Sequence, residues 1–417
     1  MELNITRKQI AKNFSWLLAG NAASGLLNFF AIIYIARVLG ATAFGLVQFA
    51  QAFLLYLVII VDAGLSTYGT REIAREPGQA GQVSSNILLL RLLIAFLTFA
   101  LSLLVCLFLP IPGTLRLLFI ITFLLVFYRA FSIDWVFQGL EKMEYVAASK
   151  FLFAAASFGL IVALVKRPEH LLAVPLIQLF VGFVLAVFMV FVLFKFFVVF
   201  DRKLVAPRNW LNIFWLAIPL GLSTLLMQIY DNLDTIMLGF MDKPATVGIY
   251  SAAYRIFYIF AGVLSLWLAT LLPVVCRKIS DNKADAGLFQ KKIFRLTLLC
   301  VVPVTILAYF IAPFLIGLFF GQGYGEASLA LRWLIWALIP LAINGIYGGL
   351  VLIPAGRFNH FLAAAGAGAL INVVMNFILI PCFSFVGAAI ATVVAQGVAA
   401  LIAFYFSREY FALTEKA

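Results

Sequence analysis

The stretch NILLLRLLIAFLTFALSLLVCLFL, residues 86–109, decides the class of fold. About 20 consecutive apolar residues are enough to cross the hydrocarbon core of a bilayer as an α-helix, and this run is longer. Its one charged residue is Arg91. A charge in hydrocarbon costs at least about 2.5–3.5 kcal/mol, so such a residue usually faces a protein interior or a wet cavity. The run therefore predicts a transmembrane helix that turns Arg91 toward other helices.

Further apolar runs of comparable length occur along the chain. They cover residues 14–38, 43–66, 115–138, 146–165, 171–199, 211–240, 246–275, 294–320, 328–353, 358–381 and 384–406. With 65% hydrophobic and 11% charged residues and a mean hydropathy of +1.12, the composition lies outside the range of soluble globular proteins. We predict an all-α integral membrane protein with about 12 transmembrane helices. The first run is too long for a signal peptide and is expected to stay as the first helix.

The basic residues are distributed unevenly between the two sides of the membrane. If the N-terminus is cytoplasmic, most Lys and Arg residues fall in cytoplasmic connections, notably 200–210 and 276–293, and few fall on the other side. This positive-inside bias predicts a multi-pass protein of the plasma (inner) membrane with both termini in the cytoplasm. Because topology accounts for the formal net charge of +12, we expect no nucleic-acid partner.

The two halves of the chain are similar when one is shifted along the other. AFGLV at 43–47 then overlays TVGIY at 246–250, and six apolar runs fall in each half. An even number of crossings gives both halves the same orientation, as in transporters built from parallel repeats. We predict an N-terminal lobe over 1–205 (helices 1–6) and a C-terminal lobe over 206–417 (helices 7–12), related by a pseudo-two-fold axis along the membrane normal.

Charged residues inside the apolar runs are the best indication of what the protein handles. They are Asp62, Arg91, Arg129, Asp134, Asp231, Asp234, Arg255 and Arg332. At a rise of 1.5 Å per residue, Asp231 and Arg255 reach similar depths on adjacent antiparallel helices. Arg91 and Asp134 are level in the same way. Each pair is either a static ion pair or a site that opens as the protein works, and the sequence leaves both options open.

The residue types indicate what such a site would bind. Arginine engages phosphate oxygens in bidentate fashion and stays charged, so an excess of arginine favours a phosphorylated, anionic cargo. Asp231 and Asp234 are three residues apart and share a helix face. Two carboxylates in low dielectric resist ionising together, which makes them a candidate proton or sodium site. The alternative pairs one of them with Arg255 and leaves the other at the solvent edge.

Several kinds of chemistry have no motif in this chain. It contains no GxxxxGK[ST], HExxH, GxSxG or CxxC sequence, and neither His170 nor His360 has a metal-ligand partner at a recognisable spacing. We therefore predict that the protein is neither an ATP-driven pump nor an enzyme, with no catalytic residue and no bound metal. The cofactor left open is a coupling H+ or Na+.

Four short motifs are similar to one family. ARVLG at 36–40, FG at 44–45, DAGL at 62–65 and REIAR at 71–75 resemble the polysaccharide and O-antigen (Wzx-type) flippases of the multidrug/oligosaccharidyl-lipid/polysaccharide exporter superfamily. The resemblance implies two six-helix bundles around a V-shaped central cavity. It also implies alternating access that carries a polyprenyl-pyrophosphate-linked oligosaccharide from the cytoplasmic to the outer leaflet. Lipid II flippases of the same superfamily usually have two further helices, which this chain lacks.

The leading hypothesis is therefore a lipid-linked oligosaccharide flippase, with ion coupling left open. The predicted residues for binding pyrophosphate or acidic sugars are Arg37, Arg91, Arg129, Arg255 and Arg332. The predicted ion-coupling or gating residues are Asp62, Asp134, Asp231 and Asp234. Expected partners are the lipid-linked oligosaccharide, the bilayer, and a polysaccharide polymerase with chain-length proteins. The alternatives are a cation-coupled multidrug or toxin exporter of the same fold and a membrane-embedded polysaccharide polymerase or ligase.

Overall fold

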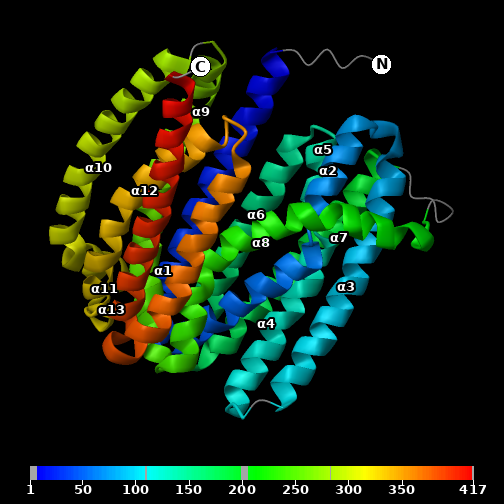
Figure 1. The fold of residues 1–417 in the computed structure, drawn as a ribbon. Coiled ribbons are helices and arrows are strands. Elements are labelled where there is room, and N and C mark those ends of the chain that lie inside the picture. Colours follow the sequence, from blue (N-terminus) through cyan, green and yellow to red (C-terminus); the bar gives the residue numbers. More distant parts are fainter. Residues whose placement is uncertain (1–6, 109, 199–204, 282, 416–417) are drawn as a thin grey trace. The chain divides into compact units, whose positions relative to one another are not determined.

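The computed structural model describes residues 7–108, 110–198, 205–281 and 283–415 (Figure 1). Across these ranges the regular structure is helical, without a strand, which confirms the predicted all-α class. The helices are α1 (Arg7–Asp62), α2 (Leu65–Arg75), α3 (Ala80–Phe108), α4 (Gly113–Phe131), α5 (Asp134–Gly139), α6 (Met143–Leu164), α7 (Ala173–Phe196), α8 (Trp210–Met241), α9 (Pro244–Asp281), α10 (Lys283–Phe320), α11 (Ala327–Leu334), α12 (Leu338–Asn344) and α13 (Phe358–Glu415). Short 3-10 and π turns connect some of them: η1 (Pro77–Gln79), η2 (Pro168–Leu172), η4 (Pro207–Asn209), η5 (Gln322–Tyr324), η6 (Ile335–Ala337) and η7 (Gly345–Leu352).

Two of the helices are too long to cross a membrane once. The apolar part of α1 has 48 residues, about 70 Å at 1.5 Å per residue, and that of α13 has 51. Each is broken in its middle, α1 at Gly40 (φ 73°, ψ 168°) and α13 at Ser384 (φ 53°, ψ −135°). The described residues hold nine apolar spans. Counting both halves of these two spans, and adding α8, gives the twelve crossings expected from the sequence.

Three predicted helices are interrupted. The run at 43–66 stops at Asp62, because Ala63 (φ 43°) and Gly64 (φ 83°) are left-handed. The run at 115–138 breaks between α4 and α5. The run at 328–353 consists of α11, η6, α12 and η7 instead of one α-helix. Pro340 has no N–H to bond the carbonyl four residues earlier, and the backbone tightens into the 3-10 turn η6 just before it.

The chain forms two compact units. The first unit comprises Met1–Gly40 with Ala50–Gln228, and the second Ala41–Phe49 with Ile229–Ala417. They differ from the predicted lobes over 1–205 and 206–417 at two places. The first half of α8 joins the first unit, because Ala217 is buried in its core. The segment Ala41–Phe49 joins the second, because a Cβ on Gly45 would lie only 1.8 Å from the Pro244 carbonyl oxygen. The pseudo-two-fold relation and the V-shaped cavity stay predictions.

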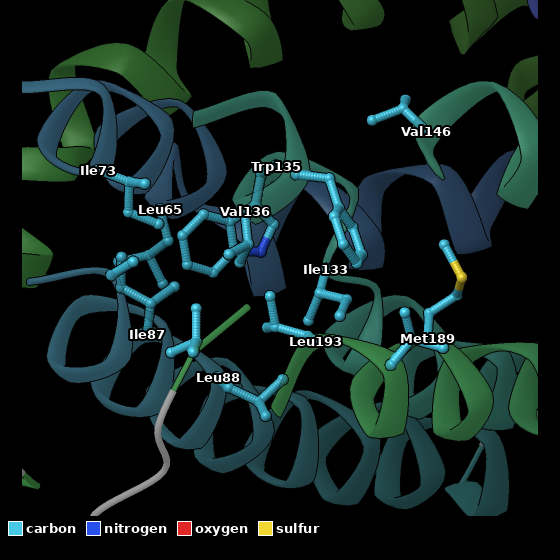
Figure 2. Packing of buried hydrophobic residues seen from close by; sticks show 14 of the residues in the cluster. Leu65, Ile73, Ile87, Leu88, Ile133, Trp135, Val136, Val146, Met189 and Leu193 are labelled. Atoms are coloured by element: carbon cyan, nitrogen blue, oxygen red, sulfur yellow. The ribbon is translucent and has the colours of Figure 1, made fainter. Parts of the chain in front are cut away.

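A hydrophobic cluster holds one end of the first unit together. Leu65 and Ile73 from α2, Ile87 from α3 and Trp135 from α5 are all nearly or fully buried in it. Figure 2 shows these side chains converging, with Leu193 of α7 among them. In Figure 1, α2 and α5 lie at one end of this unit and the α3–α4 connection lies at the other. The cluster thereby fixes the turn after α1 next to the break between α4 and α5.

Gly64→Ala is expected to destabilise the first unit. A Cβ at Gly64 would lie 2.3 Å from the Ala217 carbonyl oxygen, and the left-handed φ of 83° disfavours any side chain. Overpacking of this kind costs about 1–3 kcal/mol, and the strained backbone adds to it. Thermal unfolding of the detergent-purified protein measures the loss. Gly25→Ala is the control, because its Cβ would meet nothing within 4 Å. Equal unfolding midpoints for the two variants would contradict the packing described.

Candidate functional site

Arg91 of α3 lies beside the end of α1 in the first unit. Its side chain is 5% exposed, and its Nη2 lies 3.5 Å from Oδ1 of Asp62. The Ser66 hydroxyl donates a hydrogen bond to the same carboxylate oxygen. The ion pair is with Asp62 rather than with the predicted partner Asp134, because α1 ends directly beside Arg91 whereas Asp134 starts a new helix after a break. The distance of each residue from the helix–helix turn therefore predicted the depth of Arg91 in the membrane but not the residue with which it pairs.

Arg91 also caps α4. Its Nη1 donates to the Ser132 carbonyl at 2.9 Å, and its Nη2 donates to the Arg129 carbonyl at 2.7 Å. The last carbonyls of a helix have no partner inside that helix, and a cation at this end also interacts favourably with the helix dipole. The guanidinium therefore stabilises the position at which α4 stops and α5 begins.

Arg91→Leu is expected to lower the stability of the protein strongly. The substitution leaves the Asp62 carboxylate without its cation and removes the guanidinium donors from the Arg129 and Ser132 carbonyls at the end of α4. Removing one partner of a fully buried ion pair costs roughly 3–5 kcal/mol, most of it from the charge left behind, and the 28% exposure of the Asp62 side chain places the expected loss below that range. The unfolding midpoint of the purified variant tests this, with Arg167→Leu in an exposed position as the control. If both variants unfold at the wild-type temperature, Arg91 is not a structural residue.

The other predicted residues of the first unit are Arg37, Arg129 and Asp134. Arg129 is exposed, with its guanidinium 5.2 Å from the centre of the Tyr128 ring. Asp134 opens α5, with the Ser149 hydroxyl within hydrogen-bonding reach. Arg37 is exposed on α1, just before the break at Gly40. The structure thus joins Arg91 to Asp62, and it places Arg37 and Arg129 at exposed positions.

Asp234 lies at the centre of a polar cluster in the second unit. It is 2% exposed and comes from α8. Tyr250 of α9 donates to its Oδ2 at 2.6 Å, and Thr392 of α13 donates to the same oxygen at 2.7 Å. Asn376 of α13 donates to Oδ1 at 2.6 Å and to Asn372 at 3.0 Å. None of these donors is charged, so the described residues solvate the carboxylate with neutral dipoles.

This cluster has the chemistry of a small-cation or proton site. Hard cations take oxygen ligands, and the cluster supplies carboxylate, hydroxyl and amide oxygens from three helices. The buried Asn376 Oδ1 has no hydrogen-bond partner among the described residues. It is therefore an oxygen ligand that the surrounding side chains leave unused.

Arg255 lies within the apolar part of α9. Its Nη2 is 3.4 Å from Oε1 of Gln48 on α1, and Tyr254 and Tyr258 flank it. Among the described side chains no carboxylate forms an ion pair with it. The side chain of its predicted partner Asp231 lies outside the described residues, so that pairing stays a prediction. Arg255 presents a guanidinium whose donors are mostly unused by the described protein.

Arg332 of α11 contacts Tyr309 of α10. Its Nε lies 3.4 Å from the Tyr309 carbonyl oxygen, and its guanidinium stands 5.3 Å from the centre of that ring. The side chain is partly buried. An arginine on an aromatic face keeps part of its donor fork free for a ligand.

Several residues of the candidate site were not singled out from the sequence. Tyr250, Asn376 and Thr392 are neutral residues in apolar runs, and 142 positions separate Asp234 from Asn376. Polar residues at membrane depth were the available indication, since they rarely face lipid. Gln48 is a similar case, a polar residue in the second apolar run that meets Arg255 only through the fold.

The apolar helices define a multi-pass membrane protein, and its fold is that of two groups of solved transporters. An inward-facing multidrug resistance MATE family transporter of the MOP superfamily matches with a TM-score of 0.74 at 17% identity, over 94% of this chain and 96% of that chain. The inward closed conformation of the lipid II flippase MurJ matches with a TM-score of 0.75 at 15% identity, over 95% of this chain and 87% of that one. Likeness at these identities shows the fold.

The family follows from the sequence comparison. The model of the family described as polysaccharide biosynthesis protein matches residues 10–279, well over half of the chain, and the chain belongs to that family. This confirms the resemblance noted from the short motifs. A second model, MatE, matches residues 219–378.

Two curated relatives span most of the chain. A “Putative O-antigen transporter” of Escherichia coli K12 is 23% identical over 416 residues, covering 94% of this chain and 95% of its own length. A protein of the same description from Shigella dysenteriae is 25% identical over 378 residues, covering 88% and 92%. A capsular polysaccharide biosynthesis protein CapF of Staphylococcus aureus is 26% identical over 48% of this chain and 50% of its own length.

Proposed function

We propose that the protein is a flippase that moves a polyprenyl-pyrophosphate-linked oligosaccharide from the inner to the outer leaflet by alternating access. The observation that carries the proposal is Arg255, a guanidinium inside an apolar helix with Gln48 as its polar contact and no described carboxylate beside it. A fixed cation at this depth suits a pyrophosphate, which offers several oxygens to the planar donor fork. Membership of the polysaccharide biosynthesis family and the O-antigen transporter relatives support the same reading.

We further propose that transport is coupled to H+ or Na+ at Asp234. The carboxylate is buried, is held by neutral donors, and lies in the unit that also carries Arg255. Neutralising a buried charge removes its desolvation cost, so a proton or a sodium ion would change the stability of this cluster. Asp62 has a different role, since Arg91 neutralises it in place.

We propose a location in the plasma (inner) membrane with both termini in the cytoplasm. The excess of Lys and Arg in alternate connections supports this orientation. The partners would be the lipid-linked oligosaccharide and the surrounding bilayer, with a polysaccharide polymerase and chain-length proteins acting on the exported product. The protein would leave the bonds of its cargo unchanged and so would not be an enzyme.

Reconstitution tests the proposed function directly. Proteoliposomes are loaded with undecaprenyl pyrophosphate bearing one N-acetylglucosamine, and a lectin added outside reports the lipid that reaches the outer leaflet. Vesicles with the protein should expose the internal pool, and protein-free vesicles should not. Mass spectrometry of the recovered lipid should show no chemical change. A lengthened or transferred glycan would instead identify a polymerase or ligase.

A multidrug or toxin exporter of the same fold is the second candidate. The MatE match over residues 219–378 and the MATE structures favour it. The arginines at membrane depth oppose it, because they repel a cationic drug. In a deletion strain, altered drug tolerance with intact surface polysaccharide would support the exporter, whereas loss of polysaccharide with unchanged tolerance would support the flippase.

Arg129→Glu is expected to abolish surface polysaccharide while the protein accumulates normally. The side chain is exposed and its guanidinium contacts the Tyr128 ring, so the substitution changes the charge offered to a ligand more than the packing. A like charge facing a phosphate costs several kcal/mol. Immunoblots of the membrane fraction and staining of surface glycan measure the two quantities. Normal export of polysaccharide by this variant would show that Arg129 does not contact the cargo.

A further inference from the structure

A polar pocket of about 550 Å³ opens inside the first unit, beside the ion pair of Arg91. Its size is within the range of small-molecule sites. Its lining comes from α2, from Arg91 of α3, from Ser132 and from α5, which contributes Asp134, Trp135 and Gln138. The proposed topology places this end of the unit on the cytoplasmic side.

Two buried donors of this lining have no partner among the described residues. Arg91 and Trp135 are each 4% exposed, and neither the Arg91 Nε nor the Trp135 Nε1 has a hydrogen-bond partner in the part of the chain that the structure describes. Buried N–H groups in proteins almost always donate a hydrogen bond, so a buried N–H without an acceptor indicates that a partner is missing. Both lie in side chains that line the same pocket. The explanation favoured by this coincidence is a ligand that supplies acceptor oxygens.

The charges of the pocket show what kind of acceptor fits. Arg91 is neutralised by Asp62 at 3.5 Å, and Arg71 is neutralised by Glu72 at 3.0 Å. Asp134 adds a carboxylate to the lining. A simple anion would gain from the N–H donors but would meet that carboxylate. A hydroxyl both donates and accepts, so a ligand with several hydroxyls can bond Asp134 and the two free N–H groups together.

We propose that this pocket binds a pyranose ring of the cargo on the cytoplasmic side, with Trp135, Asp134 and Gln138 as its specificity-determining residues. The inference rests on the proposed flippase function and deepens it, because it assigns recognition of the sugar to this pocket and recognition of the pyrophosphate to Arg255. Hydroxyl side chains of α2, an amide, a carboxylate and an indole together give the ligand both donors and acceptors.

The position of the Trp135 indole depends on α2. Gly69 has no side chain, and a Cβ there would lie 2.2 Å from Cζ3 of Trp135. Thr70 donates a hydrogen bond to the Trp135 carbonyl at 3.0 Å, which ties α5 to α2 at the same level. The ring is also packed in the hydrophobic cluster with Leu65 and Ile73 (Figure 2). The indole is thus held rigidly, as a residue that discriminates between sugars must be.

The test compares two lipids in the same proteoliposomes. One is undecaprenyl pyrophosphate bearing N-acetylglucosamine, detected by an external lectin, and the other is undecaprenyl pyrophosphate without sugar, detected by an external phosphatase. Trp135→Phe removes the indole N–H and keeps an aromatic ring. It should lower transport of the sugar-bearing lipid by about tenfold relative to the sugar-free lipid, because about tenfold is the effect of one lost hydrogen bond. Trp215→Phe, exposed in the same unit, is the matched control. An equal loss for both lipids overturns the proposal.

A second measurement does not depend on transport. Thr67 is an exposed residue of the pocket lining, so a cysteine at this position can react with a maleimide. Thr67→Cys is made in a chain in which serine replaces the four native cysteines, Cys106, Cys276, Cys300 and Cys382. The rate of maleimide labelling is then measured with and without a sugar. Methyl N-acetylglucosaminide or methyl galactoside should slow the labelling. Protection without transport would support the pocket and refute the flippase. Gln138→Leu, made in the same chain, should weaken the protection by sugar. Protection by phosphorylethanolamine alone would show a lipid headgroup site and overturn the sugar proposal. Labelling of Thr67→Cys that no sugar slows would overturn it as well.

Discussion

Arg255→Gln is expected to abolish export of the lipid-linked glycan without reducing the amount of folded protein. The guanidinium contacts Gln48 at 3.4 Å, and no described carboxylate depends on it for neutralisation. Losing it therefore leaves no unpaired counter-charge among the described side chains, whereas the loss of Arg91 leaves Asp62. A hydrogen bond to a charged group contributes about 1.5–3 kcal/mol, so each bond lost to the pyrophosphate lowers affinity roughly 10- to 150-fold.

The lysine variant separates charge from geometry. Arg255→Lys keeps the positive charge but replaces the planar fork with a point charge, so transport should be intermediate between wild type and Arg255→Gln. Transport is measured in proteoliposomes and surface glycan in cells, with membrane protein quantified in both. Arg167→Gln, an exposed arginine outside the helices, is the control. Wild-type export by Arg255→Gln would refute the proposed pyrophosphate contact.

Asp234→Asn is expected to remove the response of transport to an ion gradient. The amide matches the carboxyl in shape, so Tyr250 and Thr392 still find an oxygen, but the site can no longer gain or lose a charge. Coupling between two sites is typically 1–3 kcal/mol, about 5- to 150-fold in apparent affinity. Wild-type proteoliposomes should speed up when a pH or Na+ gradient is imposed, and the variant should transport at one rate with or without it.

The cluster around Asp234 also predicts which ion is used. Thr392→Val and Asn376→Leu each remove an oxygen ligand while keeping the carboxylate. Both should weaken the response to Na+ if sodium binds, and should leave the response to a pH gradient largely intact if a proton does. Asp242→Asn neutralises a carboxylate that holds Ser384 outside this cluster, and serves as the control. A gradient response that survives Asp234→Asn would contradict coupling at this position.

Much of the fold could be predicted because the solvent is a bilayer. An apolar run must become a helix there, since every backbone N–H and C=O has to be bonded within the segment. The runs at 86–109 and 146–165 are helices as expected, α3 and α6. The interruptions were harder to predict. Gly40 bends α1 without an adjacent proline, α13 breaks at Ser384 three residues after Pro381, and the end of α4 depends on a cap supplied by another helix.

The candidate site was predictable in part. The cost of a charge in hydrocarbon singled out Arg91, Asp234 and Arg255, and the structure buries Arg91 and Asp234 and half-buries Arg255. Their partners could not be predicted in this way. A hairpin relates only neighbouring helices, whereas Asp62 meets Arg91 across the turn after α1, and Asn376 reaches Asp234 from a helix 142 residues away.

The sequence by itself determined the class of protein, the number of crossings and the residues that had to be buried, because hydropathy and the cost of burying charge act on each segment separately. Only the tertiary structure decided which of those charges are neutralised. It joins Arg91 to Asp62 as a helix cap, surrounds Asp234 with neutral donors, and leaves Arg255 with Gln48. These differences arise from contacts between helices distant in the chain, and such contacts leave no periodic signal in the sequence.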